Sequence, residues 1–472
     1  MFNKILIANR GEIAVRIIRA CKEMDIKSVA VYSEVDQHAL YVKIASEAYC
    51  LGSQAVAGYL NAHRLVNIAI ASGCDAIHPG YGFLSENALF AQVCEQRNIK
   101  FIGPTSAIIA KLGDKIQARQ TMIEAGVPVT PGSEENLASI DDAVTMAADI
   151  GYPVMLKATS GGGGRGIREC YNEKDLRHFY PRVISEASKA FGSAEVFLEK
   201  CIVNPKHIEV QILADEHGNV IHLYERDCSI QRRHQKLIEI APSPQLTPEQ
   251  QEFIGNTAVK AAKAANYTNA GTVEFLLDKD DNFYFMEVNT RLQVEHTITE
   301  QITGIDIVQE QIHIANGGEL HYKQEDIVKR GYAIEFRINA EDPQNDFLPS
   351  YGKITRYYSP GGPGVRTDAA IYTGYEIPPF FDSMCAKLIV WALDWDGLIR
   401  RSRRALSDMR VYGVKTTIPY QEAILNNEEF LSGNFDTSFV EQHPELINYS
   451  VKSSNQHMAL AIAAAIAAYE GM

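Results

Sequence analysis

Residues 271–296 read GTVEFLLDKDDNFYFMEVNTRLQVEH, and this stretch predicts a β-hairpin. Two runs of β-branched and aromatic residues, Thr272–Leu277 and Phe283–Val288, flank a break that is rich in Asp and Asn. With Lys279–Asn282 as the loop, the two strands keep one register along their whole length. The positions of the neighbouring side chains follow from that register.

The predicted register brings two carboxylates together. Asp278 faces Phe283 in it, and Glu274 lies directly opposite Glu287. Carboxylates that face each other across strands repel, so we expect a cation between them. Hard oxygen ligands suit Mg²⁺ held together with phosphates better than zinc, for which the sequence has no Cys/His cluster.

Alternation along an extended chain continues this polar edge beyond the hairpin. The side chains expected to point one way are those of Glu287, Asn289, Arg291, Gln293 and Glu295. Those expected to point the other way are Val288, Thr290, Leu292 and Val294. A surface hairpin with a solvated polar face is the alternative interpretation.

Composition places the chain among ordinary globular proteins. It has 472 residues, of which 46% are hydrophobic and 22% charged, so we expect two to four domains. A net charge of −14 argues against nucleic-acid binding, because no basic stripe would meet the phosphates. Eight scattered cysteines without a CxxC pair indicate inert thiols in a reducing cytoplasm, and the N-terminus does not read as a signal peptide.

The N-terminal region alternates strand and helix patterns, which predicts βαβ units and a mostly parallel sheet. The expected strands are Lys4–Ala8, Ser28–Tyr32, Asp75–His78 and Lys100–Ile102. The turn after the first strand is not GxGxxG, so we interpret it as a plain strand–helix turn. The Gly-rich loop at residues 78–87 follows a strand at its carboxyl end, where open α/β sheets place ligand sites.

A second Gly-rich loop, Ser160–Gly166, follows the expected strand Tyr152–Thr159. So many glycines have a steep entropic cost, which favours a backbone that approaches phosphate oxygens over a plain turn. The Walker pattern is absent, so we expect a flap between two strands. Lys157, on the entering strand, could reach a phosphate; a lysine that only snorkels to solvent is the alternative.

Further along, Phe197–Lys200 and His207–Leu213 read as strands, and the latter begins with a histidine that could be only a polar-face residue. Residues 228–239 carry a cationic run inside an acidic protein. A solvated face is the usual explanation of such a run, but its position between suspected nucleotide-binding stretches favours anion capture.

Gly331–Asn339 reads as a strand that carries Arg337, and an Ala-rich helix is expected over Met458–Tyr469. That helix is too short to span a bilayer and would pack on its own domain or on a partner.

Four motifs resemble those of biotin carboxylase, an ATP-grasp ligase, in the same order. They are HPGYGFLSEN at 78–87, KATSGGGGRGI at 157–167, ERDCSIQRRHQK at 225–236 and EVNTRLQVEH at 287–296. The resemblance runs from about residue 2 to about residue 445. It implies an α/β and α+β multidomain fold: a Rossmann-like parallel sheet (1–113), an ATP-grasp domain (114–330) with a glycine-loop lid near 131–203 and a C-terminal α+β domain (331–446). The Ala-rich helical tail (447–472) expected from the sequence follows these domains.

The family's functional positions carry over to matching residues of this sequence. ATP contacts are implied for Lys115, Lys157, Gly163, Gly164, Glu199, Lys200, Ile202, His207, Gln231, His234 and Leu276. Metal ligands are implied at Glu274, Glu287 and Asn289, and bicarbonate contacts at Lys236, Arg291, Gln293 and Val294. Glu295 would be the general base, and Arg337 would face the biotin ureido oxygen; Lys236 and Arg291 complete the implied catalytic set.

The implied reaction converts ATP, bicarbonate and biotin into ADP, phosphate and carboxybiotin, with Mg²⁺ or Mn²⁺ as the metal. There is no Met-Lys-Met biotin-attachment site, so biotin would be carried by a separate carrier or carboxyltransferase subunit. Arg19 and Glu23 lie four apart on a helix that faces a dimer partner in the family, which implies a homodimer; an intrahelical ion pair is the alternative. No nucleic-acid or membrane partner is expected.

Within the family, the tail resembles the biotin carboxylase subunit of two-subunit pyruvate carboxylases. Pro363 stands where the acetyl-CoA carboxylase branch often has an aromatic residue, and the hairpin loop is one residue longer. The alternative is the corresponding subunit of acetyl-CoA carboxylase. Two wider rivals are another ATP-grasp ligase, such as a carbamoyl-phosphate or purine-pathway enzyme, and a catalytically dead scaffold subunit.

Overall fold

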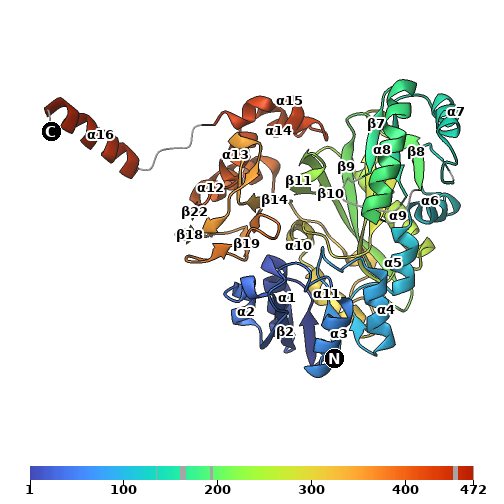
Figure 1. Ribbon diagram of the computed structural model, residues 1–472, viewed down its shortest axis with the longest axis horizontal. Coiled ribbons are helices and arrows are strands. Elements are labelled where there is room, and N and C mark those ends of the chain that lie inside the picture. Colours follow the sequence, from blue (N-terminus) through green and yellow to red (C-terminus); the bar gives the residue numbers. More distant parts are fainter. Residues whose placement is uncertain (134, 160–165, 192–194, 450–454, 471–472) are drawn as a thin grey trace.

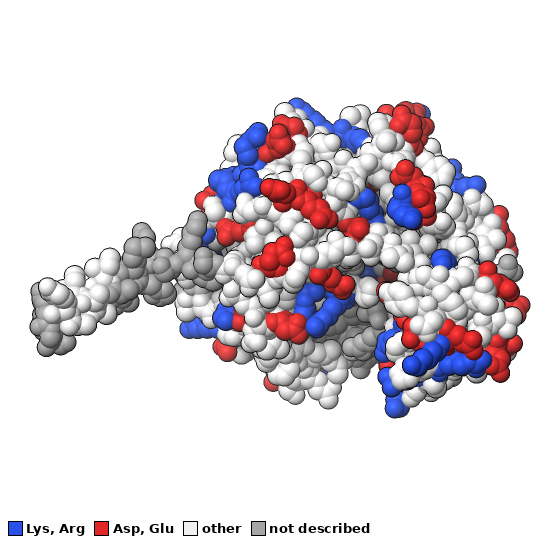
Figure 2. All heavy atoms as spheres, turned by 90° about the horizontal axis from the view of Figure 1, so that it is seen from above, with Lys and Arg blue, Asp and Glu red and all other residues white. Residues whose placement is uncertain are grey.

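The structure is a computed structural model that describes residues 1–133, 135–159, 166–191, 195–449 and 455–470 (Figure 1). Two large sheets and one small sheet form the body. Acidic and basic side chains are interspersed over the face shown in Figure 2, and no continuous basic stripe crosses that face. In the described residues, no helix is long and apolar enough to cross a membrane.

The N-terminal sheet has five parallel strands in the order β3-β2-β1-β4-β5. The strands are β1 (Lys4–Ile7), β2 (Lys27–Tyr32), β3 (Glu47–Cys50), β4 (Ala76–His78) and β5 (Lys100–Phe101). Helices α1 (Gly11–Glu23), α2 (Leu40–Ile44), α3 (Ala62–Ala71), α4 (Ala88–Gln96) and α5 (Ser106–Gly113) connect or cover them. The predicted parallel sheet is confirmed. The sequence analysis missed β3, an edge strand whose mostly exposed side chains leave no hydrophobic signal.

The central sheet has eight strands in the order β13-β12-β9-β10-β11-β14-β21-β19, and each pairs antiparallel with its neighbours. Their bounds are β9 (Lys206–Ala214), β10 (Val220–Arg232), β11 (Gln235–Ala241), β12 (Asn269–Leu277), β13 (Phe283–Asn289), β14 (Tyr332–Asn339), β19 (Val365–Ala369) and β21 (Met384–Ala392). The sheet therefore continues without a break from the central region into the C-terminal region, because β11 pairs directly with β14.

The central hairpin is β12–β13, but its register is not uniform. Leu277, and not Asp278, pairs with Phe283, so that part of the predicted register is wrong. A bulge between Phe275 and Glu274 then shifts the pairing of the strands by one residue. Glu274 is consequently the partner of Glu287, as predicted. The loop is one residue longer than predicted, because the Asp278 carboxylate accepts backbone hydrogen bonds from Asp280 and Asn282 within it.

A small sheet in the order β7-β6-β8 lies apart from the two large ones. Its strands are β6 (Val154–Ala158), β7 (Ile167–Cys170) and β8 (Val196–Lys200), and α7 (Ile140–Ile150) and α8 (Glu173–Phe191) pack on it. Strands β6 and β7 are the two strands expected around the glycine loop. Residues 160–165 of that loop, including Gly163 and Gly164, lie outside the described residues.

Helices complete the central and C-terminal regions. They are α6 (Lys115–Glu124), α9 (Pro248–Ala264), α10 (His296–Thr303), α11 (Ile307–Ala315), α12 (Trp395–Asp408), α13 (Ile418–Ile424), α14 (Glu428–Ser432) and α15 (Phe439–Gln442). The short pairs β15 (Glu341–Asp342) with β16 (Leu348–Pro349), β17 (Gly352–Lys353) with β20 (Glu376–Ile377), and β18 (Arg356–Tyr358) with β22 (Arg410–Tyr412) edge the C-terminal region.

The last helix, α16 (Asn455–Glu470), extends away from the body (Figure 1). It corresponds to the expected Ala-rich helix. Ile462, Ile466 and Tyr469 on it are more than half exposed, so its own domain does not cover them.

Candidate active site

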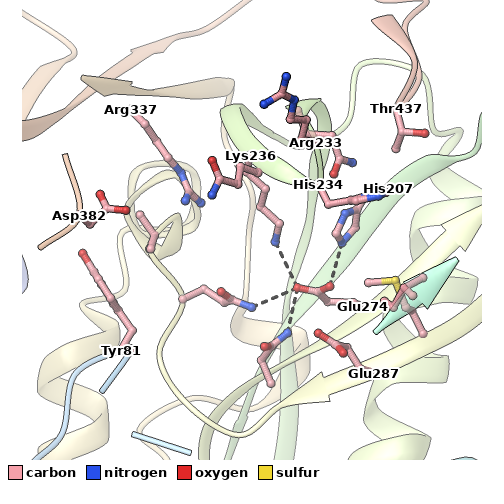
Figure 3. Close-up of a pocket in the computed structure, with 18 of the residues that line it drawn as sticks. Tyr81, His207, Arg233, His234, Lys236, Glu274, Glu287, Arg337, Asp382 and Thr437 are labelled. Atoms are coloured by element: carbon pink, nitrogen blue, oxygen red, sulfur yellow. Dashed lines mark hydrogen bonds and ion pairs between the residues drawn. The ribbon is translucent and has the colours of Figure 1, made fainter. Parts of the chain in front are cut away.

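A cavity of about 1050 Å³ lies where the three regions of the chain meet. The central sheet contributes strands β9 to β13, the N-terminal region contributes the loop around Tyr81, and the C-terminal region contributes Arg337 and the segment around Asp382 (Figure 3). The small sheet contributes Lys157 and Glu199 on the opposite wall. Segments far apart in the sequence therefore converge on one space.

The cavity brings together nearly all of the described residues predicted from the sequence. The lining contains Lys115, Lys157, Glu199, Lys200, Ile202, His207, Gln231, His234, Lys236, Glu274, Leu276, Glu287, Asn289, Arg291, Gln293, Val294 and Arg337. Glu295 does not line it but lies fully buried behind Lys236 and Arg337. The alternative of a solvated surface hairpin is wrong, since Glu274, Asn289, Gln293 and Glu295 are all buried.

The side-chain alternation expected after the hairpin holds only in part. The strand ends at Asn289, and Leu292 points away into the core shared with β1 and α1, as expected. Val294 instead lines the cavity, which contradicts the expected alternation. The reason is that the chain leaves the extended conformation and turns before α10 begins at His296.

Glu274 is the most heavily contacted carboxylate of the site (Figure 3). One oxygen accepts hydrogen bonds from Asn289 Nδ2 at 2.8 Å, Lys236 Nζ at 3.1 Å and Gln293 Nε2 at 3.2 Å. The other lies 2.9 Å from His207 Nε2. Burial alone would raise the pKa of Glu274, but Lys236 and His207 hold this pKa well below its ordinary value.

Glu287 lies beside Glu274 in a different electrostatic state. Burial and the Glu274 charge raise the pKa of the Glu287 carboxyl, and Lys115 and Lys157 only partly offset this effect. Two neighbouring carboxyls whose pKa values shift in opposite directions are typical of like charges that share one site. Burial lowers the pKa of the facing Lys115 ammonium.

Lys236 and Arg337 neutralise the carboxylates at the base of the cavity. Lys236 Nζ lies 2.7 Å from Glu209 and 2.6 Å from Glu295. Arg337 donates from Nε to Glu239 at 2.6 Å and from Nη2 to Glu295 at 3.0 Å. Burial would raise the pKa of Glu295, but these two cations hold it well below its ordinary value, so Glu295 is ionised.

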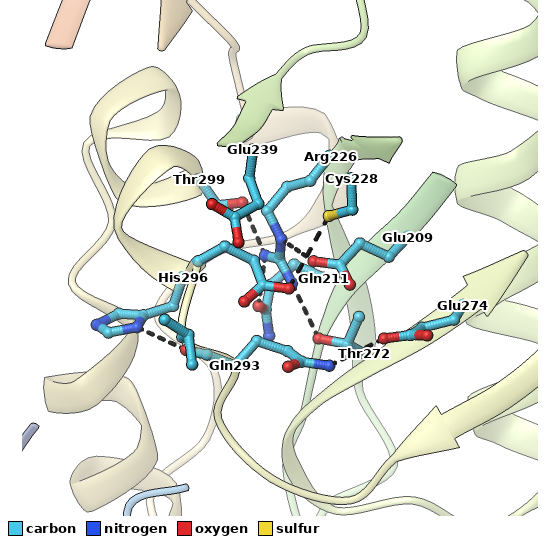
Figure 4. Close-up of polar contacts among 12 residues, drawn as sticks. Glu209, Gln211, Arg226, Cys228, Glu239, Thr272, Glu274, Gln293, His296 and Thr299 are labelled. Carbon is cyan, nitrogen blue, oxygen red and sulfur yellow. Dashed lines mark hydrogen bonds and ion pairs between the residues drawn. The ribbon is translucent and has the colours of Figure 1, made fainter. Parts of the chain in front are cut away.

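The sequence analysis missed the pair Arg226 and Glu209 (Figure 4), of which Glu209 forms an ion pair with Lys236 of the cavity lining. Both side chains are fully buried, and they are register partners on β10 and β9. The Arg226 guanidinium also donates to Gln211 at 2.8 Å and to Thr272 and Thr299 at 3.0 Å. The signal in the sequence was the alternation of His207–Leu213, which we interpreted only as a strand.

On the wall formed by the small sheet, Lys157 and Glu199 form an ion pair. The Lys200 ammonium turns away to the backbone oxygens of Gly151 and Tyr152 at 2.8 and 3.1 Å. The cationic run is a hairpin, in which Arg233 and His234 form the turn between β10 and β11. Both have positive φ, +49° and +63°, a strained conformation for non-glycine residues that is often found at functional sites.

Arg291 joins the hairpin edge to the N-terminal region. Its guanidinium donates to Glu86 at 2.8 Å, to Gln293 Oε1 at 2.8 Å and to Asn289 Oδ1 at 3.0 Å. Glu86 belongs to the Gly-rich loop at residues 78–87, which the sequence analysis placed near a ligand. The described residues therefore supply three cations, Lys236, Arg291 and Arg337, around one end of the cavity.

Models of three protein families match the chain in sequence. They are the biotin carboxylase N-terminal domain over residues 1–109, the ATP-binding domain of the carbamoyl-phosphate synthase L chain over 114–323, and the biotin carboxylase C-terminal domain over 335–442. Together they account for most of the chain.

Similar proteins include three with curated descriptions. The 2-oxoglutarate carboxylase small subunit of Hydrogenobacter thermophilus is 53% identical over 472 residues, which is all of both chains. A pyruvate carboxylase subunit of Methanothermobacter thermautotrophicus is 55% identical over 444 residues, 94% of this chain and 90% of that one. The biotin carboxylase of Nostoc sp. is 54% identical over 442 residues, 93% and 99% of the two chains.

A crystal structure of the biotin carboxylase domain dimer of the Hydrogenobacter thermophilus 2-oxoglutarate carboxylase is also similar. It covers 96% of this chain and 100% of its own, with a TM-score of 0.93 and 55% identity. That crystal contains MgADP, ADP and bicarbonate.

Proposed function

The chain belongs to the biotin carboxylase family of ATP-dependent carboxylating ligases, and we propose that it serves as the biotin carboxylase subunit of a two-subunit pyruvate carboxylase. It would carboxylate biotin carried by the other subunit, with ATP and bicarbonate as substrates. The observation that carries the proposal is that Lys236 and Arg337 converge on the buried Glu295, next to the paired Glu274 and Glu287.

The residues at the hairpin fit a magnesium or manganese ion. Glu274 and Glu287 are directly opposite each other, and burial together with the Glu274 charge raises the pKa of the Glu287 carboxyl. A divalent ion held by both carboxylates, with Asn289 beside them, would relieve that repulsion. When bound, it would supply charge neutralisation to the phosphates of ATP.

The nucleotide would occupy the space between the small sheet and the central sheet. Lys115 and Lys157 would meet the phosphates, and Gly163 and Gly164 of the glycine loop would cover them. The other proposed contacts are Glu199, Lys200, Ile202, His207, Gln231, His234 and Leu276. Entry of phosphates would draw the Lys157 ammonium away from Glu199, because an anion competes for the same cation.

Bicarbonate would bind at the end of the cavity where cations gather. Lys236 and Arg291 carry the charge needed for an anion, and Gln293 and Val294 also line the cavity. Glu295 would take the bicarbonate proton, which creates the oxygen nucleophile that attacks the γ-phosphate of ATP. The resulting carboxyphosphate breaks down to carbon dioxide and phosphate.

Entry of the anion would also make Glu295 a better base. In the structure Lys236 and Arg337 depress the pKa of Glu295, and a carboxylate held in this way is a weak proton acceptor. If Lys236 turns to bicarbonate and Arg337 turns to the biotin ureido oxygen, Glu295 loses both of these neutralising partners. Its pKa then rises because burial is no longer offset to the same extent.

Arg337 would stabilise the negative charge that develops on the ureido oxygen. The phosphate released from carboxyphosphate is the proposed acceptor of the biotin N1′ proton. The nitrogen then attacks carbon dioxide, and the guanidinium donates hydrogen bonds to the enolate-like oxygen.

The tail favours an oxo-acid carboxylase over acetyl-CoA carboxylase. The similarity to the 2-oxoglutarate carboxylase small subunit runs through the whole chain, whereas the similarity to the Nostoc biotin carboxylase covers 93% of it and the similarity to the pyruvate carboxylase subunit covers 94% of it. The exposed apolar residues of α16 would suit a contact with the second subunit. The full-length match makes 2-oxoglutarate carboxylase the second candidate. We also propose a homodimer, because the similar crystal structure is described as a dimer.

The acceptor is tested by reconstitution with the biotin-bearing carboxyltransferase subunit of the same organism. Each of pyruvate, 2-oxoglutarate and acetyl-CoA is supplied separately with ATP and labelled bicarbonate. We expect label in oxaloacetate with pyruvate. Label only with 2-oxoglutarate would select the second candidate, and label only with acetyl-CoA would reject both.

A further inference from the structure

Lys387 is a buried cation that the proposed reaction does not use. It lies on β21, and its side chain is only 1% exposed. Its ammonium donates a hydrogen bond to the backbone oxygen of Val294 at 2.5 Å. Removing an ammonium from water has a large free-energy cost, so the groups around this lysine must compensate its charge.

The sheet surface around Lys387 is crowded with charges. Lys387 is the register partner of Arg337 on β14 and of Asp368 on β19, and register partners share one face of a sheet. Glu335 lies two residues before Arg337 and pairs with Glu239 on β11, so both also lie on this face. Helices α1 and α10 cover the face and exclude water from it.

Two buried carboxyls, one on the sheet face and one on α1, feel the charge of Lys387. Its Nζ lies 3.8 Å from Glu335, and α1 brings Glu12 to the same region. Glu335 and Glu12 each have one buried oxygen without a hydrogen-bond partner among the described residues. Burial raises the pKa of Glu12 to about 7, and the nearby lysine opposes that rise. Asp368 is already paired with Arg366 through both oxygens, at 3.0 and 2.7 Å.

The hydrogen bond to Val294 connects this buried cation with the active site. Val294 stands between Gln293, which donates to Glu274 at 3.2 Å, and Glu295. The Val294 carbonyl lies in the same peptide plane as the Glu295 nitrogen. A donor that holds this carbonyl therefore fixes the direction in which the Glu295 side chain leaves the backbone.

We propose that Lys387 is a positioning residue for the bicarbonate and proton-transfer end of the site. With Glu335 3.8 Å from its ammonium, it holds the turn Gln293–Glu295 through the Val294 oxygen and so joins the C-terminal region to the central region at that point. The proposal rests on the function proposed above, and specifically on the roles of Gln293, Val294 and Glu295.

The first test compares Lys387→Met with the wild type in a steady-state assay with ATP, bicarbonate and free biotin. A displacement of the turn by about 1 Å would lower kcat/KM for bicarbonate by about 100-fold. The KM for ATP should change less than about twofold, because the proposed nucleotide contacts lie on other elements. The matched control is Lys206→Met, since Lys206 also donates one hydrogen bond to a distant carbonyl, that of Phe435 at 2.5 Å. The control should leave the bicarbonate parameters unchanged.

A second variant separates positioning from general stability. The single change Lys387→Met leaves the Glu335 carboxylate without its cation, and the double variant Lys387→Met/Glu335→Gln removes that carboxylate. The midpoint of thermal unfolding should therefore recover in the double variant. The bicarbonate defect should persist, because the Val294 oxygen still lacks its donor. Recovery of both together, or an unchanged kcat/KM for bicarbonate in Lys387→Met, would overturn the proposal. An inactive wild type would instead reject the proposed function.

Discussion

Replacement of Arg337 separates the two halves of the proposed chemistry. Among the described residues, its guanidinium has only Glu239 and Glu295 as charged partners within ion-pair distance, and neither belongs to the proposed nucleotide site. The change Arg337→Ala should therefore leave ATP binding largely intact. It should remove the group that stabilises the ureido oxygen of biotin.

The structure also sets the cost in stability. Both partners of Arg337 are fully buried, and removing one member of a buried ion pair costs about 3–5 kcal/mol. That is a large share of the stability of an ordinary domain. The double variant Arg337→Ala/Glu239→Gln leaves one buried carboxylate without its cation, where the single variant leaves two. Its loss in free energy of unfolding should therefore be about 2 kcal/mol.

The assay measures ADP release with bicarbonate, in the presence and absence of free biotin. Loss of one donor to a developing oxyanion lowers a rate by about 100- to 1000-fold. We expect that loss in the biotin-stimulated rate of both variants, with nucleotide affinity measured by calorimetry within about threefold of the wild type. A biotin-stimulated rate close to that of the wild type in the folded double variant would refute the role of Arg337.

Three further changes test other parts of the account. Glu287→Gln should raise the Mg²⁺ concentration needed for half-maximal turnover, and a wild-type Mg²⁺ titration of this variant would remove Glu287 from the metal site. Burial would raise the pKa of Glu300, but Arg16 and Arg366 lower it from 4.5 to about 2. At pH values above the unfolded pKa, the ionised Glu300 therefore adds about 3 kcal/mol to the free energy of unfolding. About 2 kcal/mol of that should be lost between pH 6 and pH 3 in urea unfolding, and a Glu300→Gln variant with the same loss would contradict this assignment. Deletion of residues 450–472 should leave the rate with free biotin unchanged and weaken the rate with the biotin-bearing subunit, and equal rates with that subunit would show that α16 makes no contact there.

Much of the fold follows from local patterns in the sequence. The alternating strand and helix patterns of the N-terminal region predict its parallel sheet, and the break at Asp278–Asn282 predicts the central hairpin. The register inside that hairpin does not follow, because no glycine or proline marks the bulge between Glu274 and Phe275 in the sequence. The predicted facing of Glu274 and Glu287 is correct because the longer loop and the bulge compensate each other.

The site is predicted where its residues lie close together in one motif, and it is missed where only the sheet brings them together. Arg291, Gln293 and Glu295 are readable from one extended stretch. Arg226 lies in the quoted motif at 225–236 without a sign of its role, Lys387 lies in an apolar run, and the partners of both are far away in the sequence. A buried charge on a strand has no recognisable signal until its partner across the sheet is known.

The continuity of the central sheet also escapes the sequence. Strand β14 begins after a stretch of loop and 3₁₀ helix, which reads as a boundary between regions. Its pairing with β11 is a long-range contact that no local pattern encodes. That pairing places Arg337 beside Glu239 and thereby within reach of Glu295.

Transfer of labelled carbon is the most direct test of the central claim. The wild-type chain is incubated with ATP, Mg²⁺, radiolabelled bicarbonate and free biotin, and the products are separated under alkaline conditions that preserve carboxybiotin. We expect label on biotin together with ADP, and a loss of both in Glu295→Gln. ADP formation that needs neither bicarbonate nor biotin, with no label on biotin, would contradict the account.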